Sequence, residues 1–346
     1  MSKERDHWIG FDLGGTKMLA VVYDADFKPL GRKRRRTKGH EGMQAGLDRM
    51  GDTIEIALKE ANVSADAIRG IGVGCPGPLD LNEGVIHEAP NLGWTDAPVR
   101  KTLEKRFGCR AVIANDVDSG VYGEYRFGAG QGARCVLGIF PGTGIGGGCV
   151  YEGRIFRGRV TSCMEVGYMK VLGSGPRAGI GPRGTLEALA SRLSIAAQAA
   201  QAAYRGQAPH LRELAGTDLS DIRSGILAKA IQAGDREVER IVSEAAGYVG
   251  DACGSLVNIL APDIIVLGGG LAEALPKLWK TTVLKHAEKT ALPSYHDTFR
   301  IEVAQLGDDA AVMGAAAWVR EEVERAATFK RQKEDASKKP GGGKNN

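Results

Sequence analysis

The stretch that most constrains this fold is a strand, a glycine turn and a second strand. It runs W-I-G-F-D-L-G-G-T-K-M-L-A-V-V from Trp8 to Val22, with apolar residues on both sides of Gly14-Gly15. Glycines at the tip let backbone N–H groups approach an anion without a side chain in the way. Thr16 and Lys17 can then donate to phosphate oxygens, and Asp12 can hold a metal ion through water. On its own, the stretch also fits an ordinary hairpin with a polar tip.

The same pattern recurs near the middle of the chain. Residues 135–140 predict a strand, P-G-T-G-I-G-G-G at 141–148 a glycine loop, and residues 149–156 a returning strand. Strands and helices alternate after each hairpin, which predicts an α/β architecture with an internal duplication. A third cluster, Gly268 to Gly270, lies between a buried strand and a helix. It could bring backbone close to a base or ribose, or form a tight turn.

The middle loop matches the dinucleotide-binding pattern G-x-G-x-x-G from Gly142 onward. That pattern requires a helix directly after the glycines. Here C-V-Y-E-G-R-I-F follows at 149–156, which predicts a strand and a turn. The loop therefore favours a hairpin that binds phosphate, with Thr143 as a side-chain donor.

The dipeptide Asn115-Asp116 follows a short buried strand, A-V-I-A. Ligands of open α/β sheets bind at the carboxyl ends of strands. A carboxylate placed there can take the proton from an attacking hydroxyl. Asn and Asp are also favoured as helix N-caps, so a purely structural role stays open at this point.

Composition limits the classes of function. The chain has 346 residues, 43% hydrophobic and 25% charged, which is typical of a soluble globular protein with two cores. A net charge of +4 is too small to indicate nucleic acid, and the basic run 32–36 predicts a solvated strand. The six cysteines lack C-x-x-C or metal spacing, which predicts buried, reduced thiols in a cytoplasmic protein. No signal peptide or membrane span is recognisable, so no membrane partner is expected.

Six motifs in order resemble the ROK family of sugar kinases, within the actin–hexokinase–Hsp70 superfamily, over residues 8–320. Besides the two hairpin loops, they are G-V-G-C-P-G-P-L-D at 72–80, A-P-N-L-G-W at 89–94, N-D-V-D-S-G-V-Y-G-E at 115–124 and I-V-L-G-G-G at 265–270. The resemblance implies an α/β, two-domain actin-like ATPase fold (ribonuclease H-like, duplicated) with a cleft between the lobes. It implies an N-terminal lobe of residues 1–116 completed by a helix at 308–328, and a C-terminal lobe of residues 117–307. Residues 329–346 are expected to form a disordered basic tail.

In such kinases the Asp of the N-D pair is the general base, so Asp116 is expected to deprotonate the sugar hydroxyl that attacks the γ-phosphate of Mg-ATP. The resemblance implies contacts to ATP and its Mg²⁺ from Asp12, Gly14, Gly15, Thr16, Lys17, Gly142, Thr143, Gly144, Gly268, Gly269 and Gly270. It implies sugar contacts from Gly77, Asn91, Asn115, Asp116, Glu165, Tyr168 and Glu187.

One region departs from the family pattern. The family has E-x-G-H followed by a cysteine-rich segment that binds structural zinc with the His. This chain has E-V-G-Y at 165–168, and residues 169–185 contain no cysteine. We therefore expect no structural zinc. Tyr168 replaces a His that usually helps hold the sugar, which leaves the identity of the sugar open.

The leading expectation is an ATP-dependent hexose kinase that converts glucose to glucose 6-phosphate. Alternatives are an N-acylhexosamine (GlcNAc or ManNAc) kinase, a glucokinase that uses polyphosphate, and a non-catalytic sugar sensor or ROK-type regulator. Regulators of the family carry a helix-turn-helix domain before the first phosphate strand. Only seven residues precede Trp8, so we expect no DNA-binding domain. Family habit suggests a homodimer.

Overall fold

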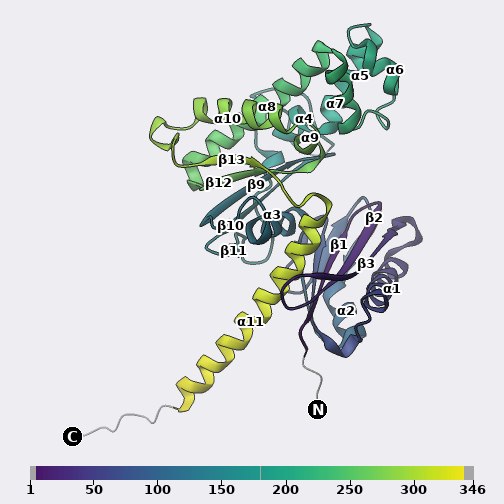
Figure 1. Cartoon of the computed structure of the whole chain (residues 1–346), viewed down its shortest axis with the longest axis vertical. Helices are drawn as coiled ribbons and strands as arrows, with labels where there is room; N and C mark the ends of the chain where they lie inside the picture. The colour runs from purple at the N-terminus through teal and green to yellow at the C-terminus, as the bar shows by residue number, and fades with distance from the viewer. Residues whose placement is uncertain (1–4, 180, 339–346) are drawn as a thin grey trace, which may run out of the picture. The chain divides into compact units, whose positions relative to one another are not determined.

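The computed structural model describes residues 5–179 and 181–338, with side chains up to residue 334. The chain divides into two compact units (Figure 1). Unit 1 contains the chain up to Ser119 together with the segment from Ala311, and unit 2 is Gly120–Ala310. The boundary falls inside helix α3 (Asp116–Phe127), whereas the family resemblance implied a boundary after Asp116.

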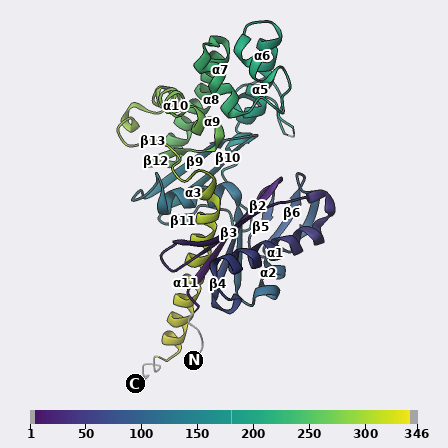
Figure 2. The same cartoon turned by 45° about the vertical axis from the view of Figure 1, so that its right-hand side comes forward.

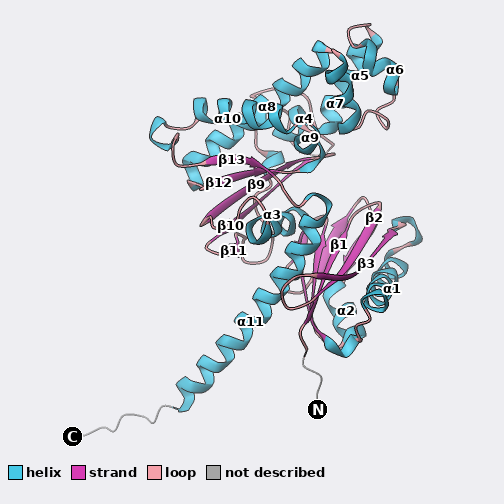
Figure 3. Ribbon diagram, viewed as in Figure 1, coloured by secondary structure: helices cyan, strands magenta, loops and turns pink. Residues whose placement is uncertain are grey.

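Unit 1 is built on a five-stranded sheet with the order β3-β2-β1-β4-β8 (Figure 3). Strand β1 pairs antiparallel with β2 and parallel with β4, and β4 pairs parallel with β8. A second sheet has the order β5-β6-β7. The strands are β1 His7–Leu13, β2 Lys17–Tyr23, β3 Pro29–Arg36, β4 Ile68–Cys75, β5 Leu79–Asp80, β6 Val85–Ala89, β7 Trp94–Ala97 and β8 Arg110–Asn115. The helices are η1 Gly39–Glu41, α1 Met43–Ala61, η2 Ala65–Ala67, α2 Val99–Phe107 and α11 Ala310–Lys338.

Glycines on the sheet of unit 1 let helix α11 lie directly against the backbone of β1 and β4. Figure 2 shows α11 beside β4. A Cβ added to Gly10 would lie 1.9 Å from the carbonyl oxygen of Val312. A Cβ added to Gly72, its partner on β4, would lie 1.8 Å from the carbonyl oxygen of Ala315. Any side chain at these two positions would push the helix off the sheet.

Unit 2 repeats the same sheet topology with the order β11-β10-β9-β12-β13. Strand β9 pairs antiparallel with β10 and parallel with β12, and β12 pairs parallel with β13. The strands are β9 Cys135–Pro141, β10 Ile145–Tyr151, β11 Arg154–Ile155, β12 Ile264–Leu267 and β13 Arg300–Val303. The helices are η3 Val166–Tyr168, α4 Leu186–Ala190, α5 Arg192–Tyr204, α6 Pro209–Ala215, α7 Ser224–Ala233, α8 Arg236–Leu260, α9 Gly269–Ala274, α10 Pro276–Thr290, η4 Pro293–Tyr295 and η5 Gly307–Asp309. Both sheets thus contain a hairpin followed by two parallel strands, which confirms the predicted duplication.

Residues 185–204 and the segment after Gly270 each have a continuous helical pattern in the sequence, which predicts one helix, but each segment forms two helices. Residues 185–204 form α4 and α5, because the side chain of Ser191 accepts a hydrogen bond from the backbone N of Ser194 and starts a new helix. The helix predicted after Gly270 is likewise divided into α9 and α10, and α10 begins at Pro276. The first break places Arg192 at the start of α5.

The last helix is longer than expected. The sequence analysis ended it at residue 328, but α11 continues to Lys338, so residues 329–338 of the expected disordered tail are helical. Good helix formers fill this segment, and the ion pair Arg320–Glu324, 2.8 Å apart, supports the same helix further toward its start. The rest of that tail, residues 339–346, lies outside the described residues.

Three predictions about surface and burial can be compared with the structure. The basic run lies on β3, whose side chains alternate between exposed and half-buried, which confirms a solvated strand. Five of the six cysteines are buried, but Cys163 is partly exposed. Among the described residues, no helix combines the length and the hydrophobicity that crossing a bilayer requires.

Candidate active site

In unit 1, several of the predicted site residues lie at the carboxyl ends of three adjacent strands. Asp12 on β1 pairs with Gly74 on β4, and Cys75 at the end of β4 pairs with Asn115 at the end of β8. Asp116 follows directly and begins α3. Asp12 and Asp116 therefore lie on the two sides of Cys75, at the edge of the sheet where ligands of α/β folds bind.

The electrostatics of Cys75 support this placement. Complete burial raises the pKa of its thiol well above the usual value, and the negative charges of Asp116 and then Asp12 raise it further. Both carboxylates are thus close enough to act on one sulfur. The raised pKa keeps this thiol neutral beside two acidic groups.

The Asn115-Asp116 dipeptide forms the junction between β8 and α3. Oδ1 of Asn115 accepts hydrogen bonds from the backbone N of Val117 at 2.9 Å and of Asp118 at 3.3 Å. Asn115 thereby caps α3. Oδ1 of Asp116 also accepts from the N of Val117, at 2.9 Å, which fixes the orientation of its half-buried carboxylate.

The Gly14-Gly15 turn is held by a residue that sequence reasoning missed. The buried Thr37 donates from Oγ1 to the carbonyl of Gly14 at 2.7 Å, and from its backbone N to the carbonyl of Thr16 at 2.9 Å. Gly15, Thr16 and Lys17 themselves are exposed. Thr37 therefore holds the base of the turn, while the residues at its tip are exposed to solvent, as phosphate binding requires.

Two of the expected sugar contacts of unit 1 lie in neighbouring loops. A Cβ on Gly15 would lie 3.2 Å from the Cβ of the exposed Asn91, so the Asn91 loop borders the glycine turn. Gly77 has φ +87°, and a Cβ there would lie 2.1 Å from the carbonyl oxygen of Glu88. Packing against β6 therefore already explains a glycine at position 77.

In unit 2, the second glycine loop joins β9 to β10. The N of Gly142 donates to the carbonyl of Gly144 at 2.8 Å, which closes the turn and leaves Thr143 exposed at its tip. Arg192 contacts this loop twice: its backbone N donates to the carbonyl of Gly142, and its Nη2 donates to Oγ1 of Thr143, both at 2.9 Å. Sequence reasoning did not identify Arg192. The strand that follows the loop also excludes the dinucleotide-binding motif.

The three residues expected to hold the sugar in unit 2 lie together. Oε2 of Glu187 accepts a hydrogen bond from the backbone N of Ile145 at 2.9 Å. Loss of hydration and the charge of Glu187 raise the pKa of Glu165. Loss of hydration, then Glu187 and Glu165, raise the pKa of Tyr168. Met164, just before this group, has φ +66°, a conformation that non-glycine residues rarely adopt and that often occurs at functional sites.

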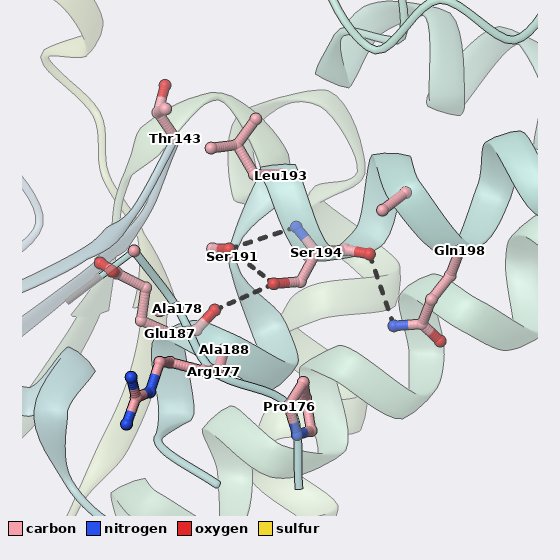
Figure 4. Close-up of a pocket in the computed structure, with 12 residues that line it drawn as sticks. Thr143, Pro176, Arg177, Ala178, Glu187, Ala188, Ser191, Leu193, Ser194 and Gln198 are labelled. Atoms are coloured by element: carbon pink, nitrogen blue, oxygen red, sulfur yellow. Dashed lines mark hydrogen bonds between the residues drawn. The ribbon is translucent and has the colours of Figure 1, made fainter. Parts of the chain in front are cut away.

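A cavity of about 430 Å³ opens beside Thr143 and Glu187 (Figure 4). Figure 4 shows hydrogen bonds that link Ser191 with Ser194, Ser194 with the carbonyl of Glu187, and Gln198 with Ser194 along the wall formed by α4 and α5. The full lining is Thr143, Pro176, Arg177, Ala178, Gly179, Glu187, Ala188, Ser191, Leu193, Ser194, Ala197 and Gln198.

The third glycine cluster packs against the end of β9. A Cβ on Gly268 would lie 2.7 Å from the ring of Phe140, and one on Gly269, which has φ +78°, would lie 2.7 Å from the carbonyl oxygen of Pro141. These contacts bring the start of α9 next to the loop that carries Thr143. They require glycine for packing alone, so nucleotide binding by Gly268–Gly270 stays a prediction.

Comparison with known proteins identifies the family. The model of the ROK family matches residues 8–322. The chain belongs to the ROK family. A glucokinase from Halalkalibacterium halodurans is 31% identical over 92% of this chain and 96% of its own. The ROK hexokinase of Thermus thermophilus has a TM-score of 0.78 and is 34% identical, covering 92% of this chain and 99% of its own.

A ROK glucokinase from Streptomyces griseus, in complex with glucose and AMPPNP, has a TM-score of 0.78 and is 28% identical over 91% of this chain and 99% of its own. The fold of this chain is therefore the two-domain, actin-like ATPase fold. A xylose repressor from Caldicellulosiruptor bescii is also similar, 25% identical over 92% of this chain and 79% of its own.

Proposed function

We propose that this chain is a sugar kinase that transfers the γ-phosphoryl group of ATP to a hexose, with glucose as the leading substrate. The observation that carries the proposal is the pair of carboxylates, Asp12 and Asp116, on either side of Cys75 at the carboxyl edge of the sheet that also bears the Gly14-Gly15 turn. Membership of the ROK family and similarity to named glucokinases and hexokinases support it.

In the proposed reaction, Asp116 takes the proton from a sugar hydroxyl as the hydroxyl oxygen attacks the γ-phosphorus of ATP. A bond forms between that oxygen and phosphorus, and the bond from phosphorus to the β,γ-bridging oxygen breaks. ADP leaves with the electron pair. Gly14 to Lys17 and Gly142 to Gly144 supply hydrogen-bond donors for the phosphates, and Gly268 to Gly270 border the nucleotide.

The acidic residues of unit 1 fit a magnesium ion that arrives with ATP. Mg²⁺ prefers oxygen ligands and is usually bound by one or two carboxylates together with substrate phosphates and water. Asp12 would hold such an ion, directly or through water. When bound, the ion offsets charge on the phosphates. Within residues 5–179 and 181–334, no group of three or more His, Cys, Asp or Glu side chains is arranged to hold a metal ion. An Mg²⁺ bound beside Asp12 would therefore take phosphate oxygens of ATP as further ligands.

The proposed sugar contacts are those that the family resemblance implies. Asn91, Asn115 and Gly77 in unit 1, and Glu165, Tyr168 and Glu187 in unit 2, are the proposed contacts. Carboxylates that accept hydrogen bonds from sugar hydroxyls discriminate strongly, because a substrate without the hydroxyl leaves them unpaired. Tyr168 offers a phenol where the family has an imidazole, so an N-acylhexosamine is the principal alternative acceptor. Polyphosphate is the alternative donor.

Two further expectations belong to this proposal. A kinase that uses ATP would act in the cytoplasm, and a homodimer is the expected assembly. Light scattering during size-exclusion chromatography tests the assembly: a mass near 73 kDa supports a dimer of the 36.7 kDa chain, and a mass near 37 kDa contradicts it.

ADP release from Mg-ATP, measured across glucose, mannose, fructose, N-acetylglucosamine and N-acetylmannosamine, tests the proposed reaction. The expected result is turnover with glucose well above the other four sugars. Turnover only with an N-acylhexosamine would show that the acceptor is that sugar and would leave the proposed phosphoryl transfer unchanged. Sugar binding by calorimetry without turnover, from either ATP or polyphosphate, would contradict the kinase and favour a sugar sensor.

A further inference from the structure

Arg192 occupies a fixed position beside the Gly142–Gly144 loop. Ser191 ends α4 and caps α5, so Arg192 is the first residue of α5. Its backbone N donates to the carbonyl of Gly142 at 2.9 Å. This bond ties the start of α5 to the loop whatever side chain stands at position 192, so the side chain itself is not needed for that connection.

The guanidinium of Arg192 lies next to the hydroxyl at the tip of the loop. Its Nη2 donates to Oγ1 of the exposed Thr143 at 2.9 Å. Among the side chains that the structure describes, no carboxylate forms an ion pair with Arg192. Oε2 of the nearby Glu187 instead accepts from the backbone N of Ile145. A positive charge without a counter-charge therefore adjoins a glycine loop.

This arrangement suits an anion. An arginine fork can donate two hydrogen bonds to the non-bridging oxygens of a phosphate. The oxygen of Thr143 accepts from Arg192, so its own hydroxyl proton is available for another acceptor. The hydroxyl and the guanidinium thus present donors side by side at the tip of the glycine loop of unit 2.

We propose that Arg192 binds the terminal phosphates of the phosphoryl donor and is a positioning residue for the transfer. This inference rests on the proposed kinase function. As the bond from the γ-phosphorus to the bridging oxygen breaks, negative charge grows on the leaving diphosphate, and the guanidinium offsets it without losing a proton. Asp116 still takes the proton of the sugar hydroxyl.

The alternative is a purely structural role, in which Arg192 only holds Thr143 in place. Substitutions of Arg192 distinguish this role from phosphate binding. Arg192→Gln keeps a side-chain donor for Thr143 but removes the charge. Arg192→Lys keeps the charge but loses the fork. Arg240→Gln is the matched control, because Arg240 is an exposed arginine of unit 2 that pairs with Glu237 and Glu244 on α8.

The experiment is calorimetric titration of each variant with AMPPNP and, separately, with AMP, which lacks the terminal phosphates. We expect Arg192→Gln to weaken AMPPNP binding about 10- to 100-fold while AMP binding changes less than about twofold. Arg192→Lys should fall in between, and Arg240→Gln should match the unsubstituted protein.

Three results would overturn the inference. Equal weakening of AMPPNP and AMP by Arg192→Gln would show that Arg192 only supports the loop. Unchanged AMPPNP binding in that variant would show that the side chain does not meet phosphate; in both cases the proposed kinase stands. If the unsubstituted protein binds neither nucleotide, the proposed function fails, and this inference fails with it.

Discussion

Replacing Gly144 with alanine should weaken sugar binding by displacing the carboxylate of Glu187, while the backbone fold is retained. A Cβ on Gly144 would lie 2.2 Å from Oε2 of Glu187, and ordinary contact begins at about 3.4 Å, so the oxygen must retreat by about 1.2 Å. That oxygen now accepts the hydrogen bond from the N of Ile145 at 2.9 Å, and the bond would break. The carboxylate is the far end of a flexible side chain, so the backbone need not move.

The size of the effect follows from that single displaced carboxylate. A hydrogen bond to a charged group contributes about 1.5–3 kcal/mol. Because Glu187 is half-buried, water can hydrogen-bond to the displaced carboxylate and offset part of that loss. We therefore expect the free energy of unfolding to fall by about 1–2 kcal/mol. If Glu187 also accepts hydrogen bonds from the sugar, its displacement should weaken sugar affinity about 10- to 100-fold.

Gly142→Ala provides the matched control on the same loop. Its Cβ would find no atom closer than the carbonyl oxygen of Gly144 at 3.9 Å, and neither glycine has a positive φ. Calorimetry with the preferred sugar and urea denaturation would be run on both variants. Equal sugar affinity in Gly144→Ala and Gly142→Ala would refute the role given to Glu187.

Three further predictions concern pH, thiol chemistry and packing. Loss of hydration and the charge of Glu187 raise the pKa of Glu165 in the folded state, so sugar affinity should fall as pH drops through that raised pKa, and Glu165→Gln should abolish this pH dependence. Because the folded state holds this proton more tightly than the unfolded state, the contribution of Glu165 to the free energy of unfolding declines as pH rises through the raised pKa. Iodoacetamide at pH 8 should label the partly exposed Cys163 well before Cys75, which is buried and has a raised pKa. Mass spectrometry showing Cys75 labelled as early as Cys163 would argue against its buried position. Gly10→Ala should lower the free energy of unfolding by about 3 kcal/mol or more, because its Cβ would lie 1.9 Å from a backbone carbonyl of α11; a loss below about 1 kcal/mol in urea denaturation would contradict this packing.

Much of the fold could be predicted because local patterns and global topology agree. Both glycine hairpins, the buried strands and the duplication follow from apolar runs separated by glycines. The order of motifs then indicated the family. Helix breaks were harder to predict: the alanine-rich segment 185–204 has a continuous helical pattern, and only the capping geometry of Ser191 shows the interruption.

The candidate site could be predicted only where a motif marks it. Asp116 and Thr143 stand in recognisable motifs. Thr37 and Arg192 do not, because they reach the glycine loops from segments distant in sequence: Thr37 lies 23 residues from Gly14, and Arg192 lies 49 residues from Thr143. Such contacts depend on tertiary packing, and neither residue type is unusual in its local sequence.

The measurement that tests the central claim most directly is the turnover number of Asp116→Asn with Mg-ATP and the preferred sugar. Asn keeps an oxygen that can accept the 2.9 Å hydrogen bond from the N of Val117, so the fold should be retained. Asp80→Asn is the control, because Asp80 accepts backbone hydrogen bonds in a turn outside the site. We predict that Asp116→Asn lowers kcat about 10²- to 10⁴-fold with sugar affinity largely kept, while Asp80→Asn stays within about threefold. A kcat for Asp116→Asn within tenfold of the unsubstituted protein would contradict the assignment of Asp116 as the general base.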